Sequence, residues 1–221
     1  MEGIFSNVMI FIFGASIGSF SNVLIDRLPK GKSVSGRSHC DYCGKKITWY
    51  DLFPIFSFIY LKARSRCCHK KLSFQYPAIE TLMAVLFLVV FLYKAPTLAM
   101  GEYYLPQLIN LLAIWGLVAS MVVIFMSDLK YHLISDYLLI SLFMFALTYI
   151  ITDGTIIILG NNLSSLIDIL FLRFSSGVIV AIPIFLLYYI SHERAMGLGD
   201  VYLSLIIGFL LGWKEVILLY I

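Results

Sequence analysis

A chain of 221 residues, of which 61% are hydrophobic and 13% charged, does not have the composition of a soluble globular domain. Such domains are about 45–50% apolar and carry about twice this share of charged residues. With a mean hydropathy of +0.93 and a net charge of only +3, the composition excludes a soluble single-core protein and predicts an all-α polytopic membrane protein.

Six apolar segments approach the length of a transmembrane helix, which needs about 20 mostly apolar residues. They cover approximately residues 4–25, 76–93, 105–127, 134–152, 165–190 and 201–213. The first is not a cleaved signal peptide, because no Lys or Arg precedes it, and Gly14-Ala15-Ser16-Ile17-Gly18 has the small-residue spacing of closely packed helices. The chain ends at Ile221 inside an apolar run too short to span a bilayer, so we expect that a final helix is missing.

The basic residues are concentrated in the segment that follows the first helix. Eleven of the 16 lie there, namely Arg27, Lys30, Lys32, Arg37, Lys45, Lys46, Lys62, Arg64, Arg66, Lys70 and Lys71. The positive-inside rule then predicts a cytoplasmic loop and an external N-terminus. Counting helices onward, the connections near 128–136 and 191–200 are also cytoplasmic, the latter with His192 and Arg194. Because topology explains these charges, we expect the lipid bilayer, and no nucleic acid, as a partner.

This pattern divides the chain into a first transmembrane helix (1–26), a cytoplasmic loop domain (27–75) and a transmembrane core (76–221). All four cysteines lie in the loop domain, where a cytosolic location favours thiols over disulfides. Cys40-Asp41-Tyr42-Cys43 has the spacing of a zinc knuckle. The second half, Ser65-Arg66-Cys67-Cys68-His69, has no matching pair, and adjacent cysteines suit one tetrahedral ion less well.

Two interpretations of the loop therefore remain open. One is a structural zinc site made by Cys40, Cys43, Cys67 and Cys68, with His39 or His69 able to supply a nitrogen ligand. The other is a loop without metal, held together by Trp49, Tyr50, Phe53, Pro54 and Phe56.

Two aspartates lie at helix ends on the predicted cytoplasmic face. Asp128 ends the third apolar segment, and Asp200 follows Gly197-Leu198-Gly199. A carboxylate at the edge of hydrocarbon is costly and is a candidate functional residue. Two carboxylates that meet share a proton, and such a pair can activate water against a peptide carbonyl. Gly197 and Gly199 would let an extended substrate approach the backbone closely.

The same carboxylates have simpler explanations. Asp200 is a suitable cap for the helix that follows it, and Asp128 could be a helix-end residue that is paired with Lys130 or solvated. We interpret Asp136 as the N-cap of the next helix, and Glu80 as a candidate for a polar contact with the basic loop.

An ordered series of motifs resembles the bacterial type IV prepilin peptidases, which are intramembrane aspartic proteases with a Gly-x-Gly-Asp motif. The resemblance covers nearly the whole chain. Its motifs are Gly18–Pro29, Ser38–Gly44, Trp49–Pro54, Leu72–Glu80, Asp128 with Ile134-Ser135-Asp136, and Met196–Asp200. Ser65 departs from the family, which has its third cysteine there, and Ser135 replaces the usual proline.

The resemblance implies an endopeptidase of the bacterial inner membrane that removes the basic leader from prepilins and pseudopilins at the cytoplasmic face. Asp128 and Asp200 match its two catalytic aspartates. It also implies N-methylation of the new amino terminus, with S-adenosylmethionine as the methyl donor.

Two other functions fit part of the pattern. A protease similar to preflagellin peptidase or signal peptide peptidase would cleave without methylating, but such enzymes typically lack this cysteine-bearing loop. A proton-coupled transporter would place its carboxylates near the bilayer midplane, often in repeated halves. Here both aspartates lie at one predicted face, and the apolar segments show no repeat.

Overall fold

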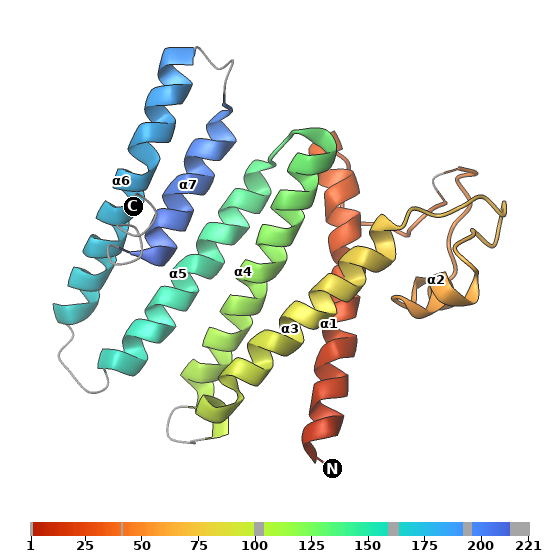
Figure 1. The fold of residues 1–221 in the computed structure, drawn as a ribbon, viewed down its shortest axis with the longest axis horizontal. Coiled ribbons are helices and arrows are strands. Elements are labelled where there is room, and N and C mark those ends of the chain that lie inside the picture. Colours follow the sequence, from red (N-terminus) through yellow and green to blue (C-terminus); the bar gives the residue numbers. More distant parts are fainter. Residues whose placement is uncertain (1, 41, 100–103, 159–163, 192–195, 213–221) are drawn as a thin grey trace. The chain divides into compact units, whose positions relative to one another are not determined.

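The computed structural model describes residues 2–40, 42–99, 104–158, 164–191 and 196–212, and these are helical apart from loops and two isolated β-bridges. Figure 1 shows the long helices, which are α1 (Glu2–Arg27), α3 (Gln75–Ala99), α4 (Tyr104–Tyr131), α5 (Asp136–Ile158), α6 (Ser164–Ser191) and the shorter α7 (Leu198–Leu211). The loop between α1 and α3 carries η1 (Leu28–Lys30), η2 (Trp49–Leu52) and α2 (Phe56–Tyr60).

The all-α polytopic fold is confirmed. Five of the described helices, α1, α3, α4, α5 and α6, are long and apolar enough to cross a membrane, and α7 is a shorter apolar helix. Each of the six apolar segments is therefore a helix, with ends within a few residues of those expected. His192, Arg194 and the apolar run that ends at Ile221 lie outside the described residues.

The chain forms two compact units. The first contains Met1–Lys94 and Met121–Leu133, and the second contains Ala95–Ser120 and Ile134–Ile221. Helix α4 contributes its first part to the second unit and its last part to the first.

In the first unit, two glycines let α1 pack closely on α3. A Cβ atom on Gly14 would lie 2.8 Å from the Cα of Ala84, and one on Gly18 would lie 2.7 Å from the Cα of Glu80. The small-residue motif in α1 is therefore the helix contact that its spacing predicts, since only glycine allows backbones this close.

At one end of this unit, α1, α3 and α4 are joined by polar contacts around Asp26. Its Oδ1 accepts a hydrogen bond from Lys130 Nζ at 2.6 Å and another from the Tyr131 hydroxyl at 2.9 Å. Its Oδ2 accepts one from the Tyr76 hydroxyl at 3.5 Å. Asn22 Nδ2 donates to the carbonyl of Tyr76 at 3.3 Å. The ends of α1, α3 and α4 are thus tied together within this unit.

In the second unit, α6 and α7 make a similar close crossing. A Cβ atom on Gly208 would lie 2.9 Å from the Cα of Gly177, and the Ser176 hydroxyl donates to the Gly208 carbonyl at 2.8 Å. Between α4 and α5, Asn110 Nδ2 donates to Thr152 Oγ1 at 3.0 Å. Small residues and buried polar pairs of this kind hold helices together in lipid.

Candidate functional site

The first cysteine pair lies on a tight turn. The Cys40 amide donates to the Lys45 carbonyl at 2.8 Å, and the Gly44 amide donates to the Cys40 carbonyl at 2.9 Å. Gly44 has a φ of +67°, in the left-handed region that favours glycine. A bridge between His39 and Lys46 closes the base of the turn.

A second turn repeats this geometry 25 residues further on. The Ser65 amide donates to the Lys70 carbonyl at 2.9 Å, and the His69 amide donates to the Ser65 carbonyl at 2.9 Å. His69 has a φ of +57°, and a bridge between Arg64 and Lys71 closes the turn. By hydrogen-bond pattern the two turns are equivalent.

The equivalence of the two turns shows that Cys67 has no cysteine counterpart in the first turn. Ser65 corresponds to Cys40 and Cys68 to Cys43, whereas Cys67 is an additional thiol inside the second turn. The second turn thus has a hydroxyl where the first has a sulfur. The Lys-Lys pair that follows each turn, at Lys45 and Lys70, is the sequence signal that could have revealed this repeat.

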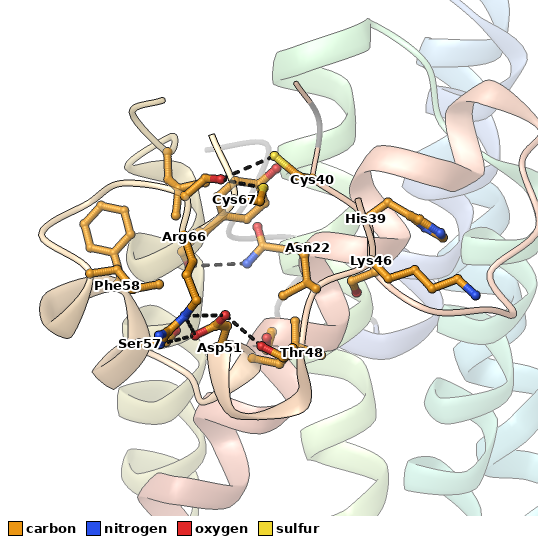
Figure 2. A pocket seen from close by; sticks show the side chains of 18 of the residues that line it. Asn22, His39, Cys40, Lys46, Thr48, Asp51, Ser57, Phe58, Arg66 and Cys67 are labelled. Atoms are coloured by element: carbon orange, nitrogen blue, oxygen red, sulfur yellow. Dashed lines mark hydrogen bonds and ion pairs between the residues drawn. The ribbon is translucent and has the colours of Figure 1, made fainter. Parts of the chain in front are cut away.

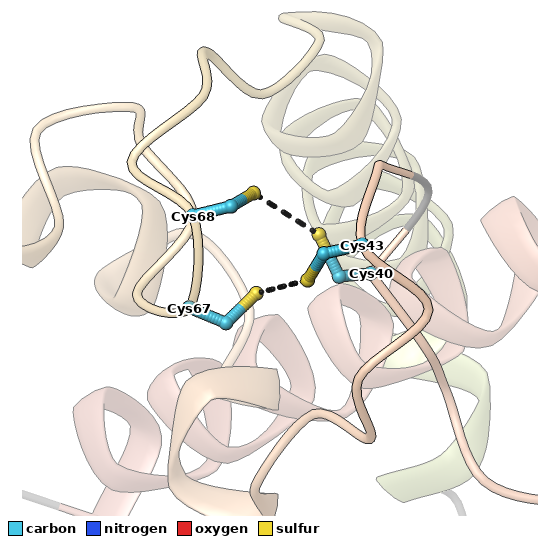
Figure 3. Close-up of side chains that lie close together, drawn as sticks. All are labelled: Cys40, Cys43, Cys67 and Cys68. Carbon is cyan, nitrogen blue, oxygen red and sulfur yellow. Dashed lines mark hydrogen bonds between the residues drawn. The ribbon is translucent and has the colours of Figure 1, made fainter.

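The four thiols converge (Figure 3). Their sulfur atoms all lie within 4.8 Å of one another. The Cys40–Cys68 pair is 3.7 Å apart and the Cys43–Cys67 pair 3.0 Å. Tetrahedral Zn²⁺ with Zn–S bonds of about 2.3 Å needs sulfurs roughly 3.8 Å apart, so the donor set fits this ion. The adjacency of Cys67 and Cys68 does not keep either out of the cluster, and neither histidine belongs to this group among the described residues.

Ser65 lies among these sulfurs and affects their ionisation. Its Oγ is 3.5 Å from Cys40 Sγ, 3.0 Å from Cys67 Sγ and 3.4 Å from Cys68 Sγ. The hydrogen bond with Ser65 outweighs burial and lowers the pKa of Cys40 to about 6, and it also lowers the pKa of Cys68. The hydrogen bond with Cys67 raises the pKa of Cys43 to about 11. The cluster therefore includes thiols inclined to ionise, and thiolates are the form that binds metal.

An ion pair ties the second turn to η2. Arg66 Nε lies 3.0 Å from both carboxylate oxygens of Asp51, and its Nη2 lies 2.8 Å from Oδ1 (Figure 2). Thr48 Oγ1 donates to Asp51 Oδ2 at 2.8 Å. Burial raises the pKa of Asp51, but the hydrogen bonds from Arg66 and Thr48 outweigh it and hold that pKa below its ordinary value.

Asp200 is the third residue of α7. Its Oδ2 accepts a hydrogen bond from the Gly197 amide at 3.2 Å. Gly197 has an extended backbone and no side chain, so only the acidic half of a capping box is present. Asp200 is therefore not the N-cap, which is Gly197, but its side chain makes a capping contact from the third helical position.

The two motif glycines have different surroundings. A Cβ atom on Gly199 would lie 3.2 Å from the Cβ of Ile134, whereas one on Gly197 would meet nothing nearer than 3.9 Å. Gly199 therefore packs against a neighbouring segment, whereas a Cβ atom on Gly197 would have only atoms of its own segment within 4 Å among the described residues.

Asp128 is exposed in the last turn of α4. The backbone carbonyl of Asp128 accepts a hydrogen bond from the His132 amide at 2.8 Å, just beyond the end of the helix. Of the two simpler explanations for Asp128, pairing with Lys130 is wrong, because Lys130 binds Asp26, whereas the exposed side chain agrees with a solvated residue at the helix end. Asp128 belongs to the first unit and Asp200 to the second.

Two further expectations have clear outcomes. Asp136 is the first helical residue of α5, and the carbonyl of Ser135 accepts the first backbone hydrogen bonds, from the amides of Leu138 and Leu139. The N-cap position is therefore Ser135, one residue earlier than expected. Glu80 does contact the loop: its Oε2 accepts a hydrogen bond from the Ile55 amide at 2.7 Å, so the partner is backbone and not a basic side chain.

Two family models match this chain in succession. One, described as the bacterial peptidase A24 N-terminal domain, matches residues 12–94, and the other, the type IV leader peptidase family, matches residues 115–221. The first covers the cysteine turns, and the second contains both Asp128 and Asp200.

Curated relatives carry the name prepilin leader peptidase/N-methyltransferase. The protein from Pectobacterium carotovorum is 29% identical over 92% of this chain and 74% of its own length. The one from Vibrio cholerae is 27% identical over 97% of this chain and 81% of its own length. A shorter match to the protein from Myxococcus xanthus is 42% identical over 36% of this chain and 24% of its own length. No solved structure matches the chain.

Proposed function

Because this chain belongs to the type IV leader peptidase family, we propose that it removes the leader from type IV prepilins and pseudopilins and then N-methylates the new amino terminus. The observation that carries the proposal is the ordered match of both family regions across one multi-pass membrane chain. The basic loop between α1 and α3 supports a cytoplasmic active face with the N-terminus outside.

Asp128 and Asp200 are the catalytic pair of this proposal. One carboxylate is ionised and takes a proton from water, whose oxygen attacks the scissile carbonyl carbon. The other is protonated and donates its proton to the carbonyl oxygen. When the resulting tetrahedral species collapses, the C–N bond breaks and the leaving amine takes a proton from the pair. The extended backbone of Gly197, which has no side chain, supports the approach of an extended substrate before α7.

The methylation step uses S-adenosylmethionine, which supplies an electrophilic methyl group on a positively charged sulfur. The new terminal amine must lose a proton before its nitrogen can accept the methyl group. The chain therefore has to hold the amine neutral and away from bulk water while the two reactants meet.

The cysteine cluster is the proposed structural metal site. Cys40, Cys43, Cys67 and Cys68 would hold a zinc ion with four protein ligands, which leaves no open position for catalysis. Its role is then to join the two turns of the loop domain, because binding of a structural metal contributes directly to folding free energy.

The test is a cleavage assay with the purified chain in detergent and a model prepilin that carries a basic leader. Mass spectrometry reports loss of the leader and gain of a methyl group on the same substrate. We expect Asp128→Asn and Asp200→Asn each to reduce cleavage to background, whereas the exposed Asp168→Asn should not. A mature substrate supplied already cleaved should still be methylated by both catalytic variants. Cleavage by either one would refute the assignment of the pair.

A further inference from the structure

A cavity of about 370 Å³ lies in the first unit, beside the cysteine turns (Figure 2). Its walls come from the last turns of α1, from η2 and α2, from both cysteine turns and from the first turns of α3. Its volume is in the range of pockets that bind small molecules, roughly 300–1,000 Å³. Neither proposed catalytic aspartate lines it, so the peptidase mechanism does not use it.

The cavity has an apolar portion and a charged portion. The apolar side chains are those of Val23, Ile47, Leu52, Phe58, Leu61 and Leu72. Pockets for cofactors typically combine such walls with a few polar groups that fix orientation. The apolar portion is suited to a planar aromatic ring, and Phe58 is a residue on which such a ring can stack.

Three carboxylates line the cavity, and two of them already have a cation. Asp51 pairs with Arg66 and Asp26 with Lys130. Glu80 differs. It is only 7% exposed, and its hydrogen bonds are with the Ile55 amide and the Ser19 side chain. Among the described residues, no basic side chain forms an ion pair with it.

A buried carboxylate is costly unless it is paired. A positively charged ligand in the cavity would therefore gain from Glu80 a charge pairing that no basic side chain of the described residues supplies. Lys46, exposed at the edge of the same cavity and without an ion pair in the described structure, offers the opposite charge for an anionic group.

We infer that this cavity binds the methyl donor, with the purine against the apolar wall and Glu80 facing the cationic sulfonium. S-adenosylmethionine carries an aromatic base, a positive charge on its sulfur and a carboxylate. The cavity offers an apolar wall for the base, Glu80 for the sulfonium and Lys46 for the carboxylate. The inference rests on the proposed methylation and assigns it a location that the peptidase reaction does not share.

Binding to the whole chain in detergent micelles tests this without relying on turnover. Calorimetry would compare S-adenosylmethionine with its demethylated product, S-adenosylhomocysteine, whose sulfur is neutral. Glu80→Gln keeps the acceptor for the Ile55 amide and removes the charge. We expect it to weaken binding of the sulfonium by about tenfold to a hundredfold and to leave the affinity for the neutral product nearly unchanged. Unchanged affinity for both ligands would overturn the inference, and equal weakening would overturn the placement of the sulfonium at Glu80.

A second variant tests the cavity without touching a charge. Ser57 lies on α2 and lines the cavity, so Ser57→Trp should fill part of it and weaken both ligands. Ser35→Trp is the matched control, because Ser35 is exposed in the same loop and outside the cavity lining. Donor binding by Ser57→Trp at the wild-type affinity would refute the location.

The same preparations distinguish failure of the inference from failure of the proposed function. If the wild-type chain cleaves and methylates while Glu80→Gln and Ser57→Trp bind the donor normally, the cavity assignment is wrong and the proposed function stands. Suppose instead that the wild-type chain binds the donor, that Ser57→Trp abolishes this binding, and that the wild-type chain does not methylate cleaved prepilin. The cavity assignment then stands and the proposed methylation is wrong.

Discussion

Ser65 holds, in the second cysteine turn, the position that Cys40 holds in the first, and its hydroxyl lies 3.5 Å from the Cys40 sulfur. Cys67, two residues later, brings its own sulfur to 3.0 Å from the Ser65 hydroxyl. The fourth thiol of the cluster is thus supplied from a different position in the turn, while the backbone hydrogen bonds of the turn are kept. Only 7% of Ser65 is exposed, so this side chain is part of the cluster and not of the surface.

The first prediction concerns moving the thiol from position 67 to position 65. Cys67→Ser should lower the amount of zinc bound per chain, because three thiolates remain where Zn²⁺ prefers four ligands. Adding Ser65→Cys to this variant should restore the metal, since the new thiol lies in the position equivalent to Cys40. Metal analysis of the purified chains measures both effects. Equal zinc in the wild type and Cys67→Ser would show that Cys67 is not a ligand.

The close crossing of α1 and α3 gives a second prediction. Gly18→Leu should destabilise the protein by about 1–3 kcal/mol, because the added Cβ would lie 2.7 Å from the Cα of Glu80 and the helices must separate. Gly3→Leu is the control in the same helix, since a Cβ there meets nothing within 4 Å. Thermal unfolding in detergent compares the two. A similar transition temperature for both variants would contradict the packing.

The ion pair between Asp51 and Arg66 predicts how the loop responds to acid. Because the pKa of Asp51 is lowered in the folded chain, the pair contributes fully above the unfolded value of about 3.9 and is lost as the pH falls through the lower, folded value. Amide hydrogen exchange in η2 and the second turn should therefore accelerate only in strong acid. Asp51→Asn should accelerate hydrogen exchange already at neutral pH, but only by a small factor, because half of the Arg66 side chain is exposed and solvent screens the pair.

The sequence was sufficient to predict the helices because 20-residue apolar segments have few alternatives in lipid. It also predicted the glycine contact of α1, since the spacing alone places Gly14 and Gly18 on one face. It could not place Ser65 inside the cluster, because equivalence of the turns rests on hydrogen bonds and not on matching cysteines. Nor could it identify the partner of Lys130, because Asp26 is 104 residues away and the nearer Asp128 was an equally open choice.

That long-range pair gives a prediction about the peptidase. Lys130 lies two residues after Asp128, so its bond to Asp26 holds the end of α4 that carries the proposed catalytic residue. Asp26→Asn and Lys130→Met should each lower the cleavage rate, and the double variant should be no slower than the slower single variant. We expect a coupling of about 0.5–1 kcal/mol, since both side chains are partly exposed. Fully additive losses would show that the two residues act independently.

Removal of the metal that we propose for the cysteine cluster should affect the two proposed activities unequally. Cys40 and Cys67 belong both to the cysteine cluster and to the wall of the cavity, whereas Asp128 and Asp200 lie outside the loop that carries the cluster. Treatment with a chelator should therefore weaken donor binding and methylation, while cleavage of the leader continues at a rate closer to that of the untreated protein. Readdition of zinc should restore methylation, because the thiolates are then held in place again. Parallel loss of cleavage and methylation, measured on the same prepilin by mass spectrometry, would mean that the cluster supports the whole chain and not the cavity in particular.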